Sequence, residues 1–217
     1  MADWVIISSL ATAGGTLVLA VATFSSVKSA NRSARVAEQS LLVGLRPVLI
    51  PSREEDPAER IRFGDGMFVT VPGHGAAVRE RDGVIYLAIA LRNGGSGLAV
   101  LHGWRAKARG KAADPAPGPD EFVRQQLDLY IPAGDNGYWQ GALRDRDQVG
   151  YGEVQEALHA HEPLEVDLLY GDHEGGQRAI ARFVISSWKE IDGDPPVSGA
   201  KRTTIVRYFN VDGAGPR

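Results

Sequence analysis

The sequence predicts a mainly β protein: an N-terminal transmembrane helix that continues into a short helical stalk, followed by an antiparallel β-sandwich. Three observations support this prediction. An uncharged run occupies the N-terminus, no proline interrupts the chain before Pro47, and the remainder alternates short apolar runs with clusters of Gly, Pro, Asn and Asp. Because strands do not alternate regularly with long helices, the pattern favours antiparallel sheets over a doubly wound fold.

The first element is the uncharged run from Trp4 to Val27. As a helix it would be about 36 Å long, enough to cross a hydrocarbon core of about 30 Å. The alternative is a cleaved secretory signal, for which Ala20-Val21-Ala22 offers a cleavage motif. Met1-Ala2-Asp3 supplies no positive n-region, however, and the run exceeds a usual signal core of about 7–15 residues. A membrane-spanning helix over residues 4–27 is therefore predicted.

The flanking charges predict the orientation of this helix. Lys28, Arg32 and Arg35 follow the run directly, whereas only Asp3 precedes it. Because Lys and Arg near a span tend to stay in the cytoplasm, we expect a single-pass plasma-membrane protein with its N-terminus outside and its β domain cytoplasmic. The alternative places that domain on the outer face. The chain contains no cysteine, so no disulfide framework argues for export.

The stalk from Lys28 to Leu45 continues the helix with a basic stripe opposite an alanine-rich one. The basic stripe either binds anionic lipid headgroups or is an ordinary solvated flank of the span. Three basic residues are fewer than a lipid-binding cluster usually contains, which favours the solvated flank. Within the span, Ala11 and Gly15 have the spacing at which helix backbones approach closely, which makes them candidates for helix packing and self-association.

Residues 46–212 are predicted to form the β-sandwich domain, after a helical region over 1–45 and before a frayed tail over 213–217. The predicted strands are Pro47–Ser52, Met67–Val71, Val84–Arg92, Gly97–Arg109, Leu127–Ile131, Tyr138–Leu143, Leu164–Tyr170, Arg178–Ser187 and Thr203–Val211.

Two glycine-rich turns and a short helix complete this prediction. Asn93–Gly97 should link neighbouring strands through residues that tolerate positive φ, and Asp172–Gly176 should link Leu164–Tyr170 to Arg178–Ser187. Tyr151–Ala160 carries apolar residues on one side and ends before Pro163, which predicts a helix.

The span, the stalk ending in Leu45–Pro51 and the predicted sandwich resemble uncharacterised single-pass membrane proteins of high-GC bacteria. The resemblance is strongest at Leu91–Ala99, which is similar to a strand–turn–strand of immunoglobulin-like bacterial domains, and at Tyr170-Gly171-Asp172. It implies a C-terminal immunoglobulin-like β-sandwich at a membrane, and it carries over no catalytic residue.

Catalytic motifs are incomplete in this sequence. Gly94–Leu98 lacks the final glycine of a nucleophile elbow, and no phosphate-binding loop is present. Asp172-His173-Glu174, with His159 and His161 nearby in sequence, could supply Zn²⁺ ligands or form a structural turn, and the turn is favoured because Asp and Gly are what a tight turn needs. We assign no catalytic residue, cofactor or metal.

A net charge of -3 and a pI near 6.0 argue against broad nucleic-acid binding. We expect a membrane-tethered binding or scaffolding module whose partners are the lipid bilayer, through residues 4–27, and a protein or a second copy of this chain; no small-molecule site is evident. The alternatives are a membrane-anchored metal-dependent hydrolase that uses Asp172, His173 and Glu174, and a subunit whose domain only stabilises an assembly.

Overall fold

The computed structural model describes residues 2–110, 114–186 and 200–212, without the side chains of residues 2–13, 39, 42, 43 and 200. The chain divides into two compact units, Met1–Gly44 and Leu45–Arg217. The predicted tail 213–217 lies outside the described residues.

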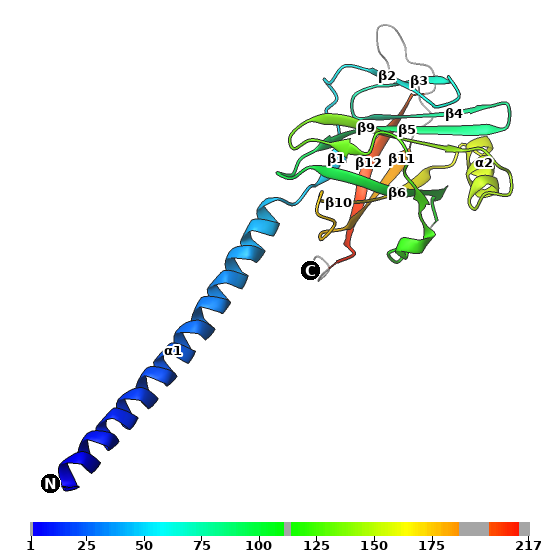
Figure 1. Ribbon diagram of the computed structural model, residues 1–217. Helices are drawn as coiled ribbons and strands as arrows, with labels where there is room; N and C mark the ends of the chain where they lie inside the picture. The colour runs from blue at the N-terminus through cyan, green and yellow to red at the C-terminus, as the bar shows by residue number, and fades with distance from the viewer. Residues whose placement is uncertain (1, 111–113, 187–199, 213–217) are drawn as a thin grey trace. The chain divides into compact units, whose positions relative to one another are not determined.

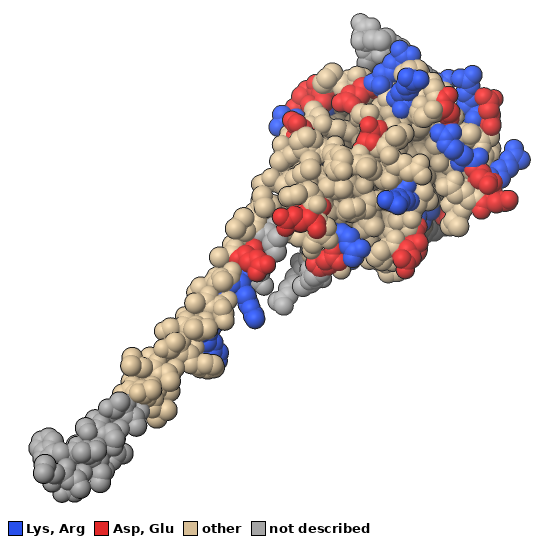
Figure 2. Space-filling model, viewed as in Figure 1, with Lys and Arg blue, Asp and Glu red and all other residues tan. Residues whose placement is uncertain are grey.

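The first unit is one helix, α1 (Ala2–Gly44), which continues past Lys28 as the sequence predicts. Figure 2 shows no charged side chain on its described N-terminal part. Among the described residues, however, no helix is long and apolar enough to cross a membrane. The transmembrane prediction is therefore not supported by the structure.

The second unit is built from strands, with two short helical pieces. The strands are β1 (Leu49–Pro51), β2 (Glu59–Arg62), β3 (Phe68–Val71), β4 (Gly75–Arg81), β5 (Val84–Asn93), β6 (Ala99–Ala108), β7 (Val123–Arg124), β8 (Tyr130–Ile131), β9 (Asn136–Leu143), β10 (Leu164–Gly171), β11 (Ala179–Ser186) and β12 (Ala200–Asn210). The helical pieces are the 3-10 turn η1 (Pro119–Glu121) and helix α2 (Tyr151–His159). Every strand pair in the described residues is antiparallel, so the predicted mainly antiparallel β fold with an N-terminal helix is confirmed.

Ten of the strands form one sheet in the order β1-β5-β4-β12-β11-β10-β6-β7, with β9 beside β5 and β8 beside β6. The β4–β12 junction is short, since it pairs Gly75–Ala77 with 200–202. The sheet folds over there, so that β5 and β9 face β6 and β10 across a common core (Figure 1). Trp104 of β6 and Trp139 of β9 meet in that core with ring centroids 5.4 Å apart. The finer description as an immunoglobulin-like sandwich stays a prediction.

Strand β5 explains how the layers stack. Its odd residues, among them Leu87 and Leu91, point into the common core, while Tyr86 and Ala88 point to the opposite face. The β2–β3 hairpin covers that second face with Ile61, Val71 and other apolar residues. A strand buried on both faces reads as a continuous apolar run, which is the pattern of Val84–Leu91. Strands β2, β4 and β7 are not among those predicted from the sequence.

The Asn93–Gly97 segment corrects one prediction. It does not join neighbouring strands, because β5 pairs with β1, β4 and β9 and not with β6. Its glycines are not in the positive-φ region either. Instead, a Cβ at Gly95 or Gly97 would lie 2.2 Å from the Arg46 oxygen or 1.7 Å from the Leu45 oxygen. Glycine is needed here for close approach of the chain that leads into β1.

Buried Asn93 fixes that approach. Its amide nitrogen donates to the oxygens of Gly97 (2.7 Å) and Ile131 (3.0 Å), and its side-chain oxygen accepts from the backbone N–H groups of Val48 (3.2 Å) and Gly95 (3.0 Å). A buried amide with all its bonds made defines one arrangement of three segments.

Candidate functional site

A cavity of about 670 Å³ lies along the edge of β6. Trp104, Leu143 and Val149 supply apolar surface to it, while Asp120 and Glu153 carry carboxylates to its wall. The cavity thus combines apolar surface with charge, which is the usual composition of a binding site.

The strand pairing leaves part of this β6 edge without a neighbouring described strand. Strand β7 pairs with β6 only at Gly103 and Trp104, and no described strand continues that pairing beyond Trp104. The chain that leads into α2 lies against the strand instead. Gly150, at φ 87°, comes so close that a Cβ there would lie 2.7 Å from the Ala106 oxygen. Only glycine meets both demands, so Gly150 sets the distance between α2 and β6.

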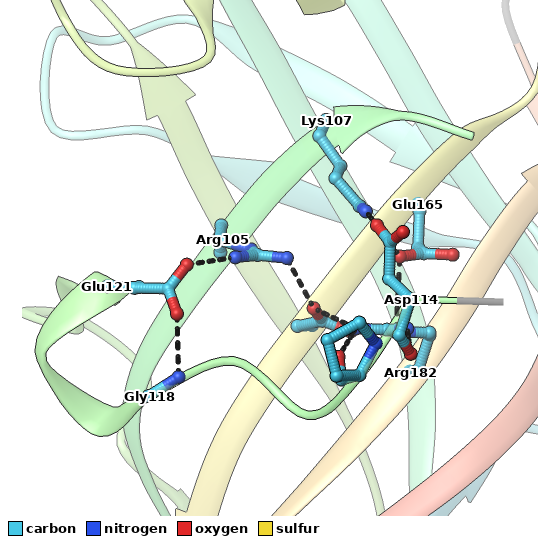
Figure 3. Close-up of polar contacts among 9 residues, drawn as sticks. Arg105, Lys107, Asp114, Gly118, Glu121, Glu165 and Arg182 are labelled. Atoms are coloured by element: carbon cyan, nitrogen blue, oxygen red, sulfur yellow. Dashed lines mark hydrogen bonds and ion pairs between the residues drawn. The ribbon is translucent and has the colours of Figure 1, made fainter. Parts of the chain in front are cut away.

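A cluster of ion pairs lies on the outer face of β6, β10 and β11 (Figure 3). Arg182, whose side chain is 3% exposed, forms a bidentate pair with Asp167, which is 1% exposed, at 2.7 and 3.0 Å. The Arg182 Nε also lies 3.1 Å from Glu165, and Lys107 lies 3.3 Å from the same carboxylate. Arg105 lies 3.5 Å from Asp167.

Strand register brings these groups together. Asp167 stands opposite Arg182 on β11 and Arg105 on β6, and Glu165 stands opposite Lys107. Residues directly opposite on one face of an antiparallel pair are close enough to interact. Burial lowers the pKa of the Arg182 guanidinium, but hydrogen bonding and attraction from Asp167 and Glu165 outweigh it and leave that pKa raised. Arg182 therefore stays charged.

The segment from Asp114 to Phe122, which we call the strap, covers this cluster. Its Asp114 and Glu121 carboxylates pair with Lys107 and Arg105. Its backbone oxygens at Asp114 and Pro115 accept hydrogen bonds from Arg182 at 3.0 and 3.3 Å. Asp114, Glu121 and Phe122 also line the cavity. The ion-pair cluster thus holds one wall of the cavity in place.

Gln125, which directly follows β7, is buried. Its amide donates to the oxygens of Leu127 (2.7 Å) and Gln140 (3.2 Å), and it accepts from the Trp139 indole at 3.2 Å. It therefore connects the segment after β7 to β9, where the two strand edges do not pair directly.

The charged groups that line the cavity are carboxylates and the cationic side chains of Arg105 and Lys107. The described residues that line it include no Ser, Thr, Cys or His, so they offer no hydroxyl, thiol or imidazole of these residue types. Two of its carboxylates, Asp114 and Glu121, are occupied by ion pairs. A backbone hydrogen bond from Gly118, together with Arg105, lowers the pKa of Glu121 despite slight desolvation.

The Asp172-His173-Glu174 segment forms the predicted turn between β10 and β11. Asp172 is buried and accepts from the Gly176 N–H at 2.9 Å, while the side chains of His173 and Glu174 are exposed. His159 lies beside Glu80 on another part of the unit. No group of three or more His, Cys, Asp or Glu within the described residues could hold a metal ion.

The predicted membrane-flanking residues Lys28, Arg32 and Arg35 all lie on α1 and are exposed. Of the candidate helix-packing pair, a Cβ placed on Gly15 would have nothing within 4 Å, and the Ala11 side chain lies outside the description. The structure thus brings no described partner to this pair.

The cavity and its ion-pair cluster are not predicted from the sequence. A signal is present, however: Arg105 and Lys107 alternate with apolar residues, and Glu165 and Asp167 do the same with the opposite charge. Such matched period-two patterns indicate neighbouring strands whose charged faces coincide.

Comparison with protein-family models, with curated proteins and with solved structures finds no match to this chain. The resemblance to single-pass membrane proteins of high-GC bacteria therefore stays a prediction.

Proposed function

We propose that this chain is a tethered binding module whose second unit takes up an extended segment of a partner protein in the cavity beside β6. The observation that carries the proposal is the cavity itself, which joins an apolar floor to carboxylates at an unpaired strand edge. No described feature favours the alternative of a metal-dependent hydrolase.

The surroundings of the cavity support a protein partner. Val149 (89% exposed) and Val123 (38%) both line the cavity, together with Phe122 and Leu143. Apolar side chains gathered on a surface mark interaction sites more often than single ones do. The module is thus suited to a segment with large apolar side chains.

The charges around the cavity indicate which side chains a partner segment would carry. Arg105 and Lys107 are already paired with strap carboxylates, whereas Asp120 and Glu153 add negative charge to the cavity wall. A segment that alternates apolar and basic side chains would complement both the floor and the wall. Strand-like peptides present alternate side chains to one surface in this way.

The tether is proposed to be α1 within a lipid bilayer. Leu17 (67%), Val18 (69%), Leu19 (68%) and Phe24 (72%) are exposed, and at 100° per residue they point to several sides of the helix. A helix that is apolar on all sides is normally buried, either in a protein core or in a membrane. The proposal rests on the exposure of these side chains and on the uncharged sequence of residues 4–27. Among the described residues, no helix is long and apolar enough to cross a membrane.

Peptide binding can be tested on the purified full-length chain. A fluorescein-labelled Lys-Leu-Lys-Leu peptide should raise its anisotropy on titration, and a Glu-Leu-Glu-Leu peptide should not. Val149→Asn, which removes apolar surface without adding charge, should weaken binding at least tenfold. Val206→Asn is the matched control, because Val206 is also exposed (45%) but lies on β12. Equal binding of both peptides, or no effect of Val149→Asn, would reject the cavity as the site.

The tether and its orientation have a separate test. Because the chain has no cysteine, Ser198→Cys introduces a single reactive thiol at a position outside the described residues. Protection of this thiol from an impermeant maleimide until cells are lysed is the result expected of a cytoplasmic β domain. Labelling in intact cells would place the domain outside, and release of the chain by sodium carbonate would exclude a bilayer tether.

A further inference from the structure

A second hollow, of about 620 Å³, lies between the β2–β3 hairpin and β4. Arg60 of β2 and Arg79 and Arg81 of β4 line it, with Met67, Phe68 and Tyr86 as its apolar surface. None of these residues lines the cavity beside β6, so the two hollows are separate.

The charges of this hollow are unbalanced towards positive. Its two carboxylates are Asp65 and Asp82. Asp65 is already engaged, since it accepts from Tyr86 at 2.7 Å and pairs with Arg144. Asp82 lies 3.3 Å from Arg81, but both side chains are mostly exposed (87% and 62%), which makes that pair weak.

Arg60 and Arg79 form no ion pair within the described residues. The chain as a whole carries a net charge of -3, so this concentration of arginine is local and does not follow from composition. A positive hollow in an acidic protein attracts anions selectively.

Two of the arginines are also oriented by their neighbours. The Arg60 guanidinium stacks over the Phe68 ring at 4.2 Å, and Arg81 Nη1 lies 3.9 Å from the Met67 sulfur. A guanidinium held on a ring loses less side-chain freedom when it binds a ligand. Its planar fork matches the oxygens of a phosphate better than a lysine ammonium does.

We propose that this hollow, which we call the arginine groove, binds a phosphate monoester with a compact apolar body. Arg60, Arg79 and Arg81 would hold the phosphate oxygens, and Phe68 and Tyr86 would contact the body. The arginine groove does not depend on the function proposed for the cavity beside β6.

Isothermal titration calorimetry of the full-length chain with phenyl phosphate tests this site. Saturable heat is expected for phenyl phosphate, a weaker response for inorganic phosphate, and none for phenol. The double variant Arg60→Gln, Arg79→Gln should weaken phenyl phosphate binding at least tenfold. Arg146→Gln, which removes one exposed arginine from the loop between β9 and α2, is the control for a loss of positive charge elsewhere and should bind as the unchanged chain does.

Three results would overturn the proposal. These are the absence of saturable heat at millimolar phenyl phosphate, equal binding by the double variant, and an equal loss of binding in Arg146→Gln, which would indicate attraction by net charge alone. Because Arg60 and Arg79 are exposed, a matching thermal unfolding midpoint for the double variant and the unchanged chain separates lost binding from lost folding.

Discussion

In the second unit, two different segments cover the two outer faces of the folded sheet, and they contact it through opposite kinds of interaction. Over β5 lies the β2–β3 hairpin, which buries Ile61, Phe63 and Val71 against Tyr86 and Ala88. Over β6, β10 and β11 lies the strap, which contacts the sheet through ion pairs and through hydrogen bonds to Arg182. The first covering is apolar and the second is electrostatic.

The two coverings should therefore respond differently to salt and to mutation. Apolar burial is non-directional and insensitive to salt. The stability that the hairpin contributes should therefore not depend on NaCl concentration, but it should fall when a buried side chain is shortened. Buried ion pairs depend on every partner being present, while exposed ones contribute little and are screened by salt. The strap therefore depends on one buried group, Arg182, far more than on its own exposed carboxylates.

The largest effect is expected from Arg182→Met. Removing this guanidinium leaves Asp167 and Glu165 buried without their main counter-charge and deprives the strap of two hydrogen bonds. The free energy of unfolding should fall by about 3–5 kcal/mol, measured by urea denaturation. Arg207→Met is the control, since both Arg182 (5.0 Å) and Arg207 (5.1 Å) lie over the Phe209 ring but Arg207 is exposed. Equal losses in the two variants would contradict an electrostatic covering.

A smaller loss is expected from Ile61→Ala in the hairpin. Ile61 is 1% exposed, and its truncation removes apolar burial and leaves a cavity. We expect a loss of about 2–3 kcal/mol, at the low end for such changes because a peripheral hairpin can settle onto the gap. This loss should be the same at 0.05 and 0.5 M NaCl. Val206→Ala, at a position 45% exposed, should change stability little.

Asp65 provides a pH-dependent test of the hairpin. Burial raises the pKa of this carboxyl, but hydrogen bonds from Arg144, Tyr86 and the Met67 N–H outweigh it and hold the pKa at about 2. The folded pKa is thus below the unfolded one, so this stabilisation is present above about pH 4 and is lost as the pH falls towards 2.

Asp65→Asn should therefore cost about 1 kcal/mol at pH 7, a value reduced because the side chain is 31% exposed. It should also flatten the fall in stability between pH 4 and pH 2, followed by thermal unfolding across that range. An identical acid profile in both proteins would exclude Asp65 as a source of the loss.

The smallest effect is expected from Glu121→Gln in the strap. The Glu121 side chain is 52% exposed, so its pair with Arg105 should contribute less than about 1 kcal/mol. Unlike the hairpin variant, the difference from the unchanged chain should shrink as NaCl rises, because salt screens exposed charges. A loss that persists undiminished at 0.5 M NaCl would show that the pair is effectively buried.

The two coverings also differ in how far the sequence predicts them. Met67–Val71 reads as a strand because it is apolar and β-branched, whereas its partner β2 carries Arg60 and Arg62 on its exposed face and reads as a loop. The segment Gly110–Pro119, which overlaps the first part of the strap, reads as a linker rich in Ala and Pro. Nothing in its composition indicates that Asp114 meets Lys107 or that its backbone meets Arg182.

Residue pattern alone determined the antiparallel β class, most strand positions, the Asp172–Gly176 turn, helix α2 and the continuation of α1 past Lys28, because alternation, turn residues and helix breakers act locally. Only the tertiary structure decided the sheet order, the cavity beside β6, the arginine groove and the use of Asn93–Gly97 as a point of close approach. These features depend on register and on contacts between segments far apart in sequence, such as Asp167 opposite both Arg105 and Arg182. Local pattern says which residues face a sheet, and the register of neighbouring strands determines which of them meet.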